Sequence, residues 1–208
     1  MPDGGADKIR KGRKFDQVLA GAREIFMSDG FEGASVDDIA KAAGVSKATL
    51  YSYFPDKRLL FLEVAKEECR AQSQTALAEI EGKGDAREVL GDVARRMMRF
   101  FFSDVGIEVH RIIVAESQRF PEIGRQFYES GPGQLRESLV AFLTEACATG
   151  EMRIEDVQLA ADQFPELCKA GLHQQMILGL RPPPSEAEID RVVEGAVEMF
   201  MCSYGARG

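Results

Sequence analysis

Hydrophobic residues recur every three or four positions through most of the chain, the spacing that places them on one face of a helix. The first stripe begins at Phe15 and predicts an amphipathic helix. This helix should end near Ser28 to Gly30, because glycine accepts the left-handed conformation that closes helices. Neither the alternating pattern typical of strands nor an internal repeat stands out in the sequence. The pattern therefore predicts an all-α protein.

Two short helices should follow the first, each opened by a serine. Ser35 precedes an apolar face that ends at Gly44, and Ser46 precedes a helix in which Leu50 points inward. A serine hydroxyl at such a position accepts a free backbone N–H of the first turn. Because glycine permits a sharp reversal between the two helices, the segment predicts a helix-turn-helix.

A fourth helix should begin after Pro55, because the residue before a proline is pushed out of helical geometry. Asp56 can cap it, and its apolar residues continue to about Thr75. The glycine-containing stretch 81–85 is then the clearest linker in the chain.

Beyond the linker, further helical stripes are broken at Pro121, at Gly131-Pro132-Gly133 and at Gly150. The last two helices are predicted over residues 156–179 and 185–204, with three consecutive prolines between them. In all, about nine helices are expected.

We divide the chain into a helix-turn-helix domain over residues 1–60 and a larger helical domain over residues 61–208. The net charge is -8, yet the first 60 residues carry ten Lys and Arg against nine Asp and Glu. A run of basic residues at 8–14 contains no acidic residue. It can meet phosphate, or it can be the solvated start of the first helix.

Composition excludes several classes of protein. The longest apolar stretches are far shorter than the ~20 residues of a membrane-spanning helix, and the first seven residues do not resemble a signal peptide, so we expect a cytoplasmic protein. The chain has only two histidines, and they lack the spacing of metal ligands. It also lacks a phosphate-binding loop and a nucleophile motif. We therefore expect neither enzymatic activity nor a metal or cofactor site. The four cysteines show no pairing pattern, and we expect them to be reduced, buried thiols: Cys69, Cys147, Cys168 and Cys202. The alternative is that one of them is a redox sensor.

The segments Gly30-Phe31, Ser35 to Ala40 and Ala43 to Phe54, together with Lys57, resemble the DNA-binding segment of the TetR family. The resemblance covers about residues 11 to 60 and departs from the family pattern at Ala48, where many relatives carry Gly. A weaker resemblance extends through residues 111–117 and 120–122. It implies a homodimeric regulator with an all-α ligand-binding domain, double-stranded operator DNA as partner and a small-molecule inducer.

The second helix of a helix-turn-helix reads the major groove, and a dimer places two such helices about one DNA turn, ~34–36 Å, apart. A pseudo-palindromic operator is therefore expected. Ser35 and Lys57 stand at helix N-termini, where a phosphate is favoured. Either Tyr51 or Tyr53 could instead pack in the domain core. The residues expected at DNA are Ser35, Ser46, Lys47, Ala48, Thr49, Tyr51, Ser52, Tyr53 and Lys57.

The larger domain should bind a small hydrophobic or amphipathic ligand, and the long fourth helix is the expected lever between ligand and DNA. Candidate pocket residues are Met97, Met98, Phe101, His110, Ile113, Glu116, Phe127 and Phe164, with surface or salt-bridge roles open for the polar ones. The last two helices offer small and apolar residues for an isologous dimer. Candidate contacts there are Leu172, Met176, Leu180, Val192, Val193, Ala196 and Phe200.

Three other functions stay open at this point. The same DNA-binding half can serve an activator as well as a repressor. An all-α enzyme would turn its ligand over, whereas a pocket binder leaves it unaltered. A protein-interaction module that had lost DNA binding would lack salt-dependent affinity for an operator.

Overall fold

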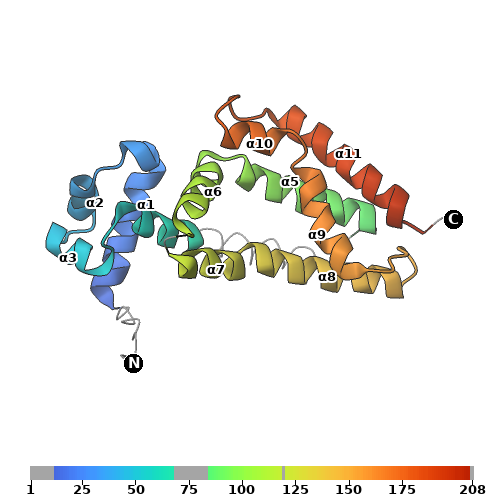
Figure 1. Cartoon of the computed structure of the whole chain (residues 1–208), viewed down its shortest axis with the longest axis horizontal. Helices are drawn as coiled ribbons and strands as arrows, with labels where there is room; N and C mark the ends of the chain where they lie inside the picture. Colours follow the sequence, from blue (N-terminus) through green and yellow to red (C-terminus); the bar gives the residue numbers. More distant parts are fainter. Residues whose placement is uncertain (1–11, 68–83, 119, 207–208) are drawn as a thin grey trace. The chain divides into compact units, whose positions relative to one another are not determined.

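The computed structural model describes residues 12–67, 84–118 and 120–206, and nearly all of these residues are helical or connect helices (Figure 1). The only β pairing within the described residues is an isolated bridge between Met152 and Gly205. The all-α prediction is thus confirmed. The basic residues before position 12, the fourth helix beyond residue 67 and the linker residues 81–83 lie outside the described residues.

The chain divides into two compact units, residues 1–67 and residues 68–208, whereas the sequence placed the boundary at residue 60. Unit 1 contains α1 (Arg13–Gly33), α2 (Val36–Ala42), α3 (Lys47–Tyr53) and a further helix over residues 57–67. Unit 2 contains α5 (Ala86–Phe101), α6 (Asp104–Glu116), α7 (Pro121–Ser130), α8 (Pro132–Ala148), α9 (Val157–Cys168), α10 (Leu172–Ile177) and α11 (Glu186–Tyr204). Among the described helices, none combines the length and apolar character that crossing a membrane requires.

Local hydrogen bonds set the helix boundaries in unit 1. The Ser35 hydroxyl accepts the N–H of Asp38 at 3.1 Å, and the Ser46 hydroxyl accepts the N–H of Thr49 at 3.1 Å. Both predicted N-caps are therefore confirmed. Gly30 has φ 71° and interrupts α1 where the sequence predicted its end, although one more helical turn follows to Gly33.

The core of unit 1 is aromatic and draws on every one of its helices. Phe15 of α1 lies 5.4 Å from Phe54 between ring centroids, and Phe26 lies 5.0 Å from Phe61. Leu50 of α3 is only 1% exposed, as the sequence predicted. A buried aromatic ring removes a large apolar area from water, so these contacts hold the short helices in place.

The backbones of α1 and α2 approach closely at Gly21. A Cβ at this position would lie 2.5 Å from the backbone nitrogen of Ala43. No real Cβ makes such a contact, and only glycine permits it without moving the backbone of the turn.

Lys57 joins the helix over residues 57–67 to the end of α1. Its ammonium donates to the carbonyl of Phe31 at 2.8 Å and to the carbonyl of Ala34 at 3.0 Å. The same nitrogen lies 4.4 Å from the centroid of the Phe31 ring. Hydrogen bonds from a charged group are stronger than those between neutral groups, so Lys57 fastens the chain reversal that follows α1.

Unit 2 surrounds a continuous apolar core. In Figure 1, α11 lies along α5, and α9 crosses near them above α8. The core contains fully buried residues from each of these helices, including Leu90, Met98, Leu143, Phe164 and Phe200. The last helix begins at a capping box, in which the Ser185 hydroxyl accepts the Glu188 N–H and the Glu188 carboxylate accepts the Ser185 N–H.

The prediction of one helix over residues 156–179 is wrong. The structure has two helices, α9 and α10, separated by a turn in which Gly171 has φ 74°. The apolar spacing continues through this turn, so periodicity alone did not reveal the break. A positive φ cannot be part of a right-handed helix, and it starts α10 in a new direction.

Gly21→Ala should destabilise unit 1 by about 1–3 kcal/mol, because the added methyl group displaces the backbone of Ala43. Gly33→Ala is the matched control in the same helix, since its Cβ meets only the Asp29 side chain at an ordinary 3.4 Å. The control should lose no stability, because alanine favours a helix by up to ~1 kcal/mol over glycine. Chemical denaturation of both variants checks this, and equal losses would contradict the packing argument.

Lys57→Met should lower the free energy of unfolding by about 1–3 kcal/mol, because it removes the ammonium from two carbonyl groups while keeping an apolar stem. Lys66→Met removes the same charge from a single, longer contact, the part-buried pair with Glu63 at 3.4 Å, and should cost less than Lys57→Met. Urea unfolding followed by circular dichroism measures both. A Lys57→Met protein as stable as the Lys66→Met protein would disprove the bridging role.

Candidate nucleic-acid interface and ligand site

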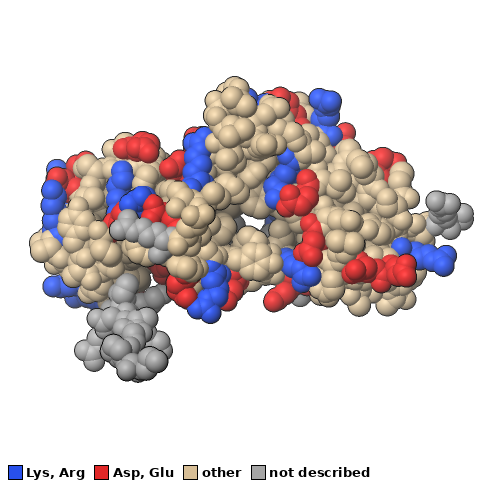
Figure 2. All heavy atoms as spheres, in the orientation of Figure 1, with Lys and Arg blue, Asp and Glu red and all other residues tan. Residues whose placement is uncertain are grey.

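Helix α3 presents most of its surface to solvent. Leu50 is its one buried residue, while Lys47, Ala48, Tyr51 and Ser52 are exposed. Tyr51 keeps 46% of its surface accessible. Over α2 and α3, Figure 2 shows Lys and Arg side chains at the outer edge with acidic side chains beside them. A short helix anchored by one leucine and capped by a serine thus displays polar and aromatic groups outward.

Lys47 is paired with the preceding helix. Its ammonium lies 2.6 Å from a carboxylate oxygen of Asp37 in α2, and both side chains are more than half exposed. The hydrogen bond to Asp37 raises the pKa of Lys47 above its ordinary value. An exposed pair of this kind contributes little stability, so the ammonium can be transferred to another anion at low cost.

The two tyrosines of α3 differ in position. Tyr53 is half-buried, with its ring centroid 5.8 Å from that of Phe15 in an edge-to-face contact. Tyr51 projects outward. Of the two tyrosines that the sequence allowed to pack in the domain core, Tyr53 is therefore the one that does so in part. The hydroxyls of Thr49 and Ser52 already have partners within the helix, namely the Ser46 hydroxyl at 2.9 Å and the Thr49 carbonyl at 2.6 Å.

The two residues expected at phosphate are occupied by internal contacts. The Ser35 hydroxyl donates to the Asp38 carboxylate at 2.5 Å, and Asp37 and Asp38 both stand in the first turn of α2. Lys57 is held by the two carbonyl groups described above. The third N–H of the Lys57 ammonium is the donor that could meet a phosphate while these two hydrogen bonds persist.

The eight pocket candidates fall into two groups. Met97, Met98 and Phe164 belong to the buried core of unit 2, and Glu116 is also buried, with 7% exposed. The half-buried candidates are Phe101 of α5, His110 and Ile113 of α6, and Phe127 of α7. Only the second group can meet a ligand without opening the core. Figure 2 also shows a hollow in unit 2 on the face that it presents.

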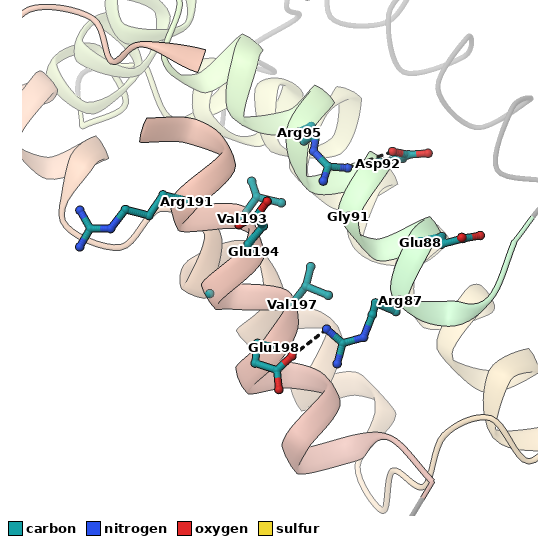
Figure 3. Close-up of a pocket in the computed structure, with 11 residues that line it drawn as sticks. Arg87, Glu88, Gly91, Asp92, Arg95, Arg191, Val193, Glu194, Val197 and Glu198 are labelled. Atoms are coloured by element: carbon teal, nitrogen blue, oxygen red, sulfur yellow. Dashed lines mark hydrogen bonds and ion pairs between the residues drawn. The ribbon is translucent and has the colours of Figure 1, made fainter. Parts of the chain in front are cut away.

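A groove of about 760 Å³ runs between α5 and α11, and none of the eight candidates lines it (Figure 3). Its walls carry charges of both signs. Arg87 pairs with Glu198 across it at 2.7 Å, and Arg95 pairs with Asp190 at 3.2 Å. These pairs hold the two helices together, and the groove lacks the apolar lining typical of a small-molecule pocket.

The two histidines of the chain meet at the contact between α6 and α10. The ring centroids of His110 and His173 lie 5.0 Å apart, with an angle of 87° between the planes. Burial lowers the pKa of His173 to about 4, with His110 and Lys169 adding to the effect. Burial and Lys169 also lower the pKa of His110. His173 was not among the predicted pocket residues, because 62 residues separate it from His110 and no sequence pattern links the two.

The candidate dimer contacts also divide by burial. Met176, Val193, Ala196 and Phe200 fill the protomer's own core and are therefore unavailable at its surface. Leu172 and Val192 are half-buried, and Leu180 is 71% exposed. Apolar periodicity identified the buried face of α11 but could not tell an intramolecular neighbour from a partner chain.

The cysteines are only partly as expected. Cys168 is buried, and burial raises the pKa of its thiol to about 12. Cys202 is exposed, so the expectation of burial is wrong there, and its bond to Glu198 raises the pKa of the thiol. Cys147 is half-buried, and Cys69 lies outside the described residues. A raised thiol pKa disfavours the reactive thiolate that a redox sensor needs.

Two family models match the chain, one in each unit. Residues 18–64 match the bacterial regulatory proteins of the TetR family. Residues 88–206 match the C-terminal domain of the AefR-like transcriptional repressors. The second match alone covers more than half of the chain.

Individual proteins agree with the family models. The chain is 37% identical to the flavonoid-responsive regulator FrrA, with a TM-score of 0.65 over 95% of this chain and 100% of that one. It is 26% identical to a TetR-family regulator from Mesorhizobium loti, with a TM-score of 0.77 over 94% and 98%. The transcriptional repressor AcnR of Corynebacterium glutamicum is 25% identical over 87% of this chain and 90% of its own. The chain therefore belongs to the TetR family of DNA-binding transcriptional regulators.

Proposed function

We propose that this regulator is a repressor that binds a pseudo-palindromic operator as a homodimer and leaves it when a small hydrophobic or amphipathic ligand binds unit 2. The observation that carries the proposal is the outward display of α3, where only Leu50 is buried and Lys47, Tyr51 and Ser52 face solvent. A helix that enters a major groove needs such a face. Because the operator lies on cytoplasmic DNA, we place the protein there.

The homodimer is supported by the exposed apolar residues of the last helices. Large side chains stand exposed at Leu159 in α9, at Leu178 and Leu180 after α10, and at Met199 in α11. Together with the half-buried Leu172 and Val192 they supply the apolar surface for an isologous contact. The charged residues of α11 would then surround it.

The effector class is suggested by the flavonoid-responsive relative, whose whole length matches 95% of this chain. We therefore propose an aromatic, amphipathic effector. Release from DNA requires that the effector bind the two states of the protein with different free energies. The helix that begins at residue 57 is the proposed lever, and its continuation beyond residue 67 lies outside the described residues.

The first test is selection of bound duplexes from random DNA. The dimer predicts two half-sites related by a dyad, with centres about one helical turn apart. Lys47→Ala combined with Tyr51→Ala should then weaken binding to the selected operator by at least about 30-fold, since each base contact contributes ~1–3 kcal/mol. Tyr53 is left intact because it packs on Phe15.

Arg153→Ala combined with Tyr128→Ala is the control, because it removes the same residue classes from exposed sites in unit 2. Fluorescence anisotropy at fixed salt compares the two proteins. Unchanged operator affinity in the α3 variant would refute the proposed function, and a single unpaired half-site in the selection would refute the dimer.

Asp37→Asn should strengthen binding to duplex DNA several-fold, about 3- to 10-fold at low salt, because it frees Lys47 and removes a negative charge beside α3. Glu24→Gln removes one charge from the exposed surface of α1 and should have a smaller effect. A salt titration measures both, and the slope of log affinity against log salt should steepen by about one for Asp37→Asn only. Equal affinities and equal salt slopes for the Asp37→Asn and Glu24→Gln variants would exclude a specific role for the ion pair between Asp37 and Lys47.

A further inference from the structure

The contact between α6 and α10 brings together hydrogen-bonding groups that the DNA-binding unit does not use. His110 and His173 lie edge to face at 5.0 Å between ring centroids, and both are half-buried. Their lowered pKa values keep both rings neutral at pH 7. A neutral imidazole offers one donor and one acceptor, so the pair supplies two of each within a small space.

These groups have no partner in the part of the chain that the structure describes. Neither imidazole forms a hydrogen bond to another described residue, and the contacts of both rings are aromatic. A half-buried imidazole without a protein partner hydrogen-bonds to water, which a ligand with its own polar groups can displace. The pair is therefore suited to a ligand that brings its own donor and acceptor.

Aromatic and cationic side chains border the pair. The ring centroids of Phe101 and Phe102 lie 6.0 Å and 6.4 Å from that of His173. The ammonium of Lys169 lies 5.7 Å from the centroid of Phe101. Phenylalanine faces favour a flat aromatic ligand, and the ammonium favours oxygen atoms with partial negative charge.

Arg111 fixes the two helices relative to each other. Its guanidinium, on α6, donates to the carbonyls of Met176 at 2.9 Å and Ile177 at 3.1 Å, which end α10. The imidazoles are thereby held in place before any ligand arrives, which lowers the entropy cost of binding. A ligand placed between α6 and α10 also touches both helices at once.

We propose that His110 and His173 bind the hydroxyl and carbonyl edge of a neutral, planar, phenolic effector, with the half-buried Phe101 alongside its rings. This inference rests on the proposed ligand-responsive function and names the residues that would form hydrogen bonds with the ligand. A phenolic hydroxyl adds a donor to the acceptor that the ring carbonyl supplies, and a donor and an acceptor together match the neutral pair. A metal ion is the competing occupant, although no group of three metal-binding side chains occurs among the described residues.

The test uses flavone and chrysin, which is flavone with two added hydroxyl groups. Because the chain has no tryptophan, binding to the full-length protein is measured by calorimetry rather than by intrinsic fluorescence. The wild-type protein should bind chrysin about tenfold more tightly than flavone, the gain expected from one or two hydrogen bonds. Operator binding without ligand is measured in parallel.

His110→Phe and His173→Phe keep a flat ring but remove its hydrogen bonds, so the preference for chrysin over flavone should disappear, with chrysin losing more affinity than flavone, which offers only the carbonyl. His173→Gln retains a donor and an acceptor and should keep part of the preference for chrysin. Gln174→Ala, at an exposed position of α10, is the control and should leave both affinities unchanged. Circular dichroism checks that each variant is folded. If a Phe variant does not fold, the chrysin and flavone affinities of His173→Gln are compared with those of the wild-type protein instead.

Equal wild-type affinity for the two ligands, or a preference for chrysin that survives both Phe substitutions, would overturn the proposal. Stoichiometric Zn²⁺ binding that depends on both histidines and excludes chrysin would overturn it in favour of a metal site. Wild-type protein that binds its operator but neither ligand would also overturn it, while leaving the DNA-binding function intact.

Discussion

The close approach of α1 and α2 at Gly21 is the contact on which the DNA-binding unit depends. The space between Gly21 and the backbone of Ala43 has no room for a side chain, so α2 and the turn after it are fixed against the longest helix of the unit. Helix α3 has only seven residues and buries only Leu50, too little to hold its own orientation. Its direction is therefore set by the turn at Gly44, where φ is 63°, and by the contacts of Tyr53 and Phe54 with Phe15 of α1.

The charges around α3 differ from the net charge of the whole chain. The whole chain carries a net charge of -8, yet the exposed surface of α3 carries Lys47 and no acidic residue. Asp37 neutralises that lysine across the helix boundary, while Lys57 is bound to the carbonyls that end α1. The ammonium of Lys47 on α3 is thus exposed and weakly paired, whereas that of Lys57 stabilises the fold.

Unit 2 combines a closed core with a half-open margin. The side chains of Phe164 and Phe200 lie in edge-to-face contact at 5.0 Å and are inaccessible to solvent or ligand. The rings of His110, in the middle of α6, and His173, near the start of α10, meet at the half-buried margin instead. A rigid core beside a polar, half-buried margin allows a small molecule to bind without disrupting the packing that keeps the domain folded.

The sequence by itself determined the structural features that depend on residues close together in the chain. The caps at Ser35, Ser46 and Ser185 and the breaks at Gly30 and Gly131 follow from hydrogen bonds and dihedral angles within a few positions. The family resemblance was also carried by one continuous segment. Tertiary structure alone decided which neighbour each apolar face meets: Val193 and Phe200 joined the protomer core, Tyr53 turned to Phe15, and His173 reached His110 after Gly171 redirected the chain. Periodicity defines a buried face but not its partner, because that partner lies far away in the sequence.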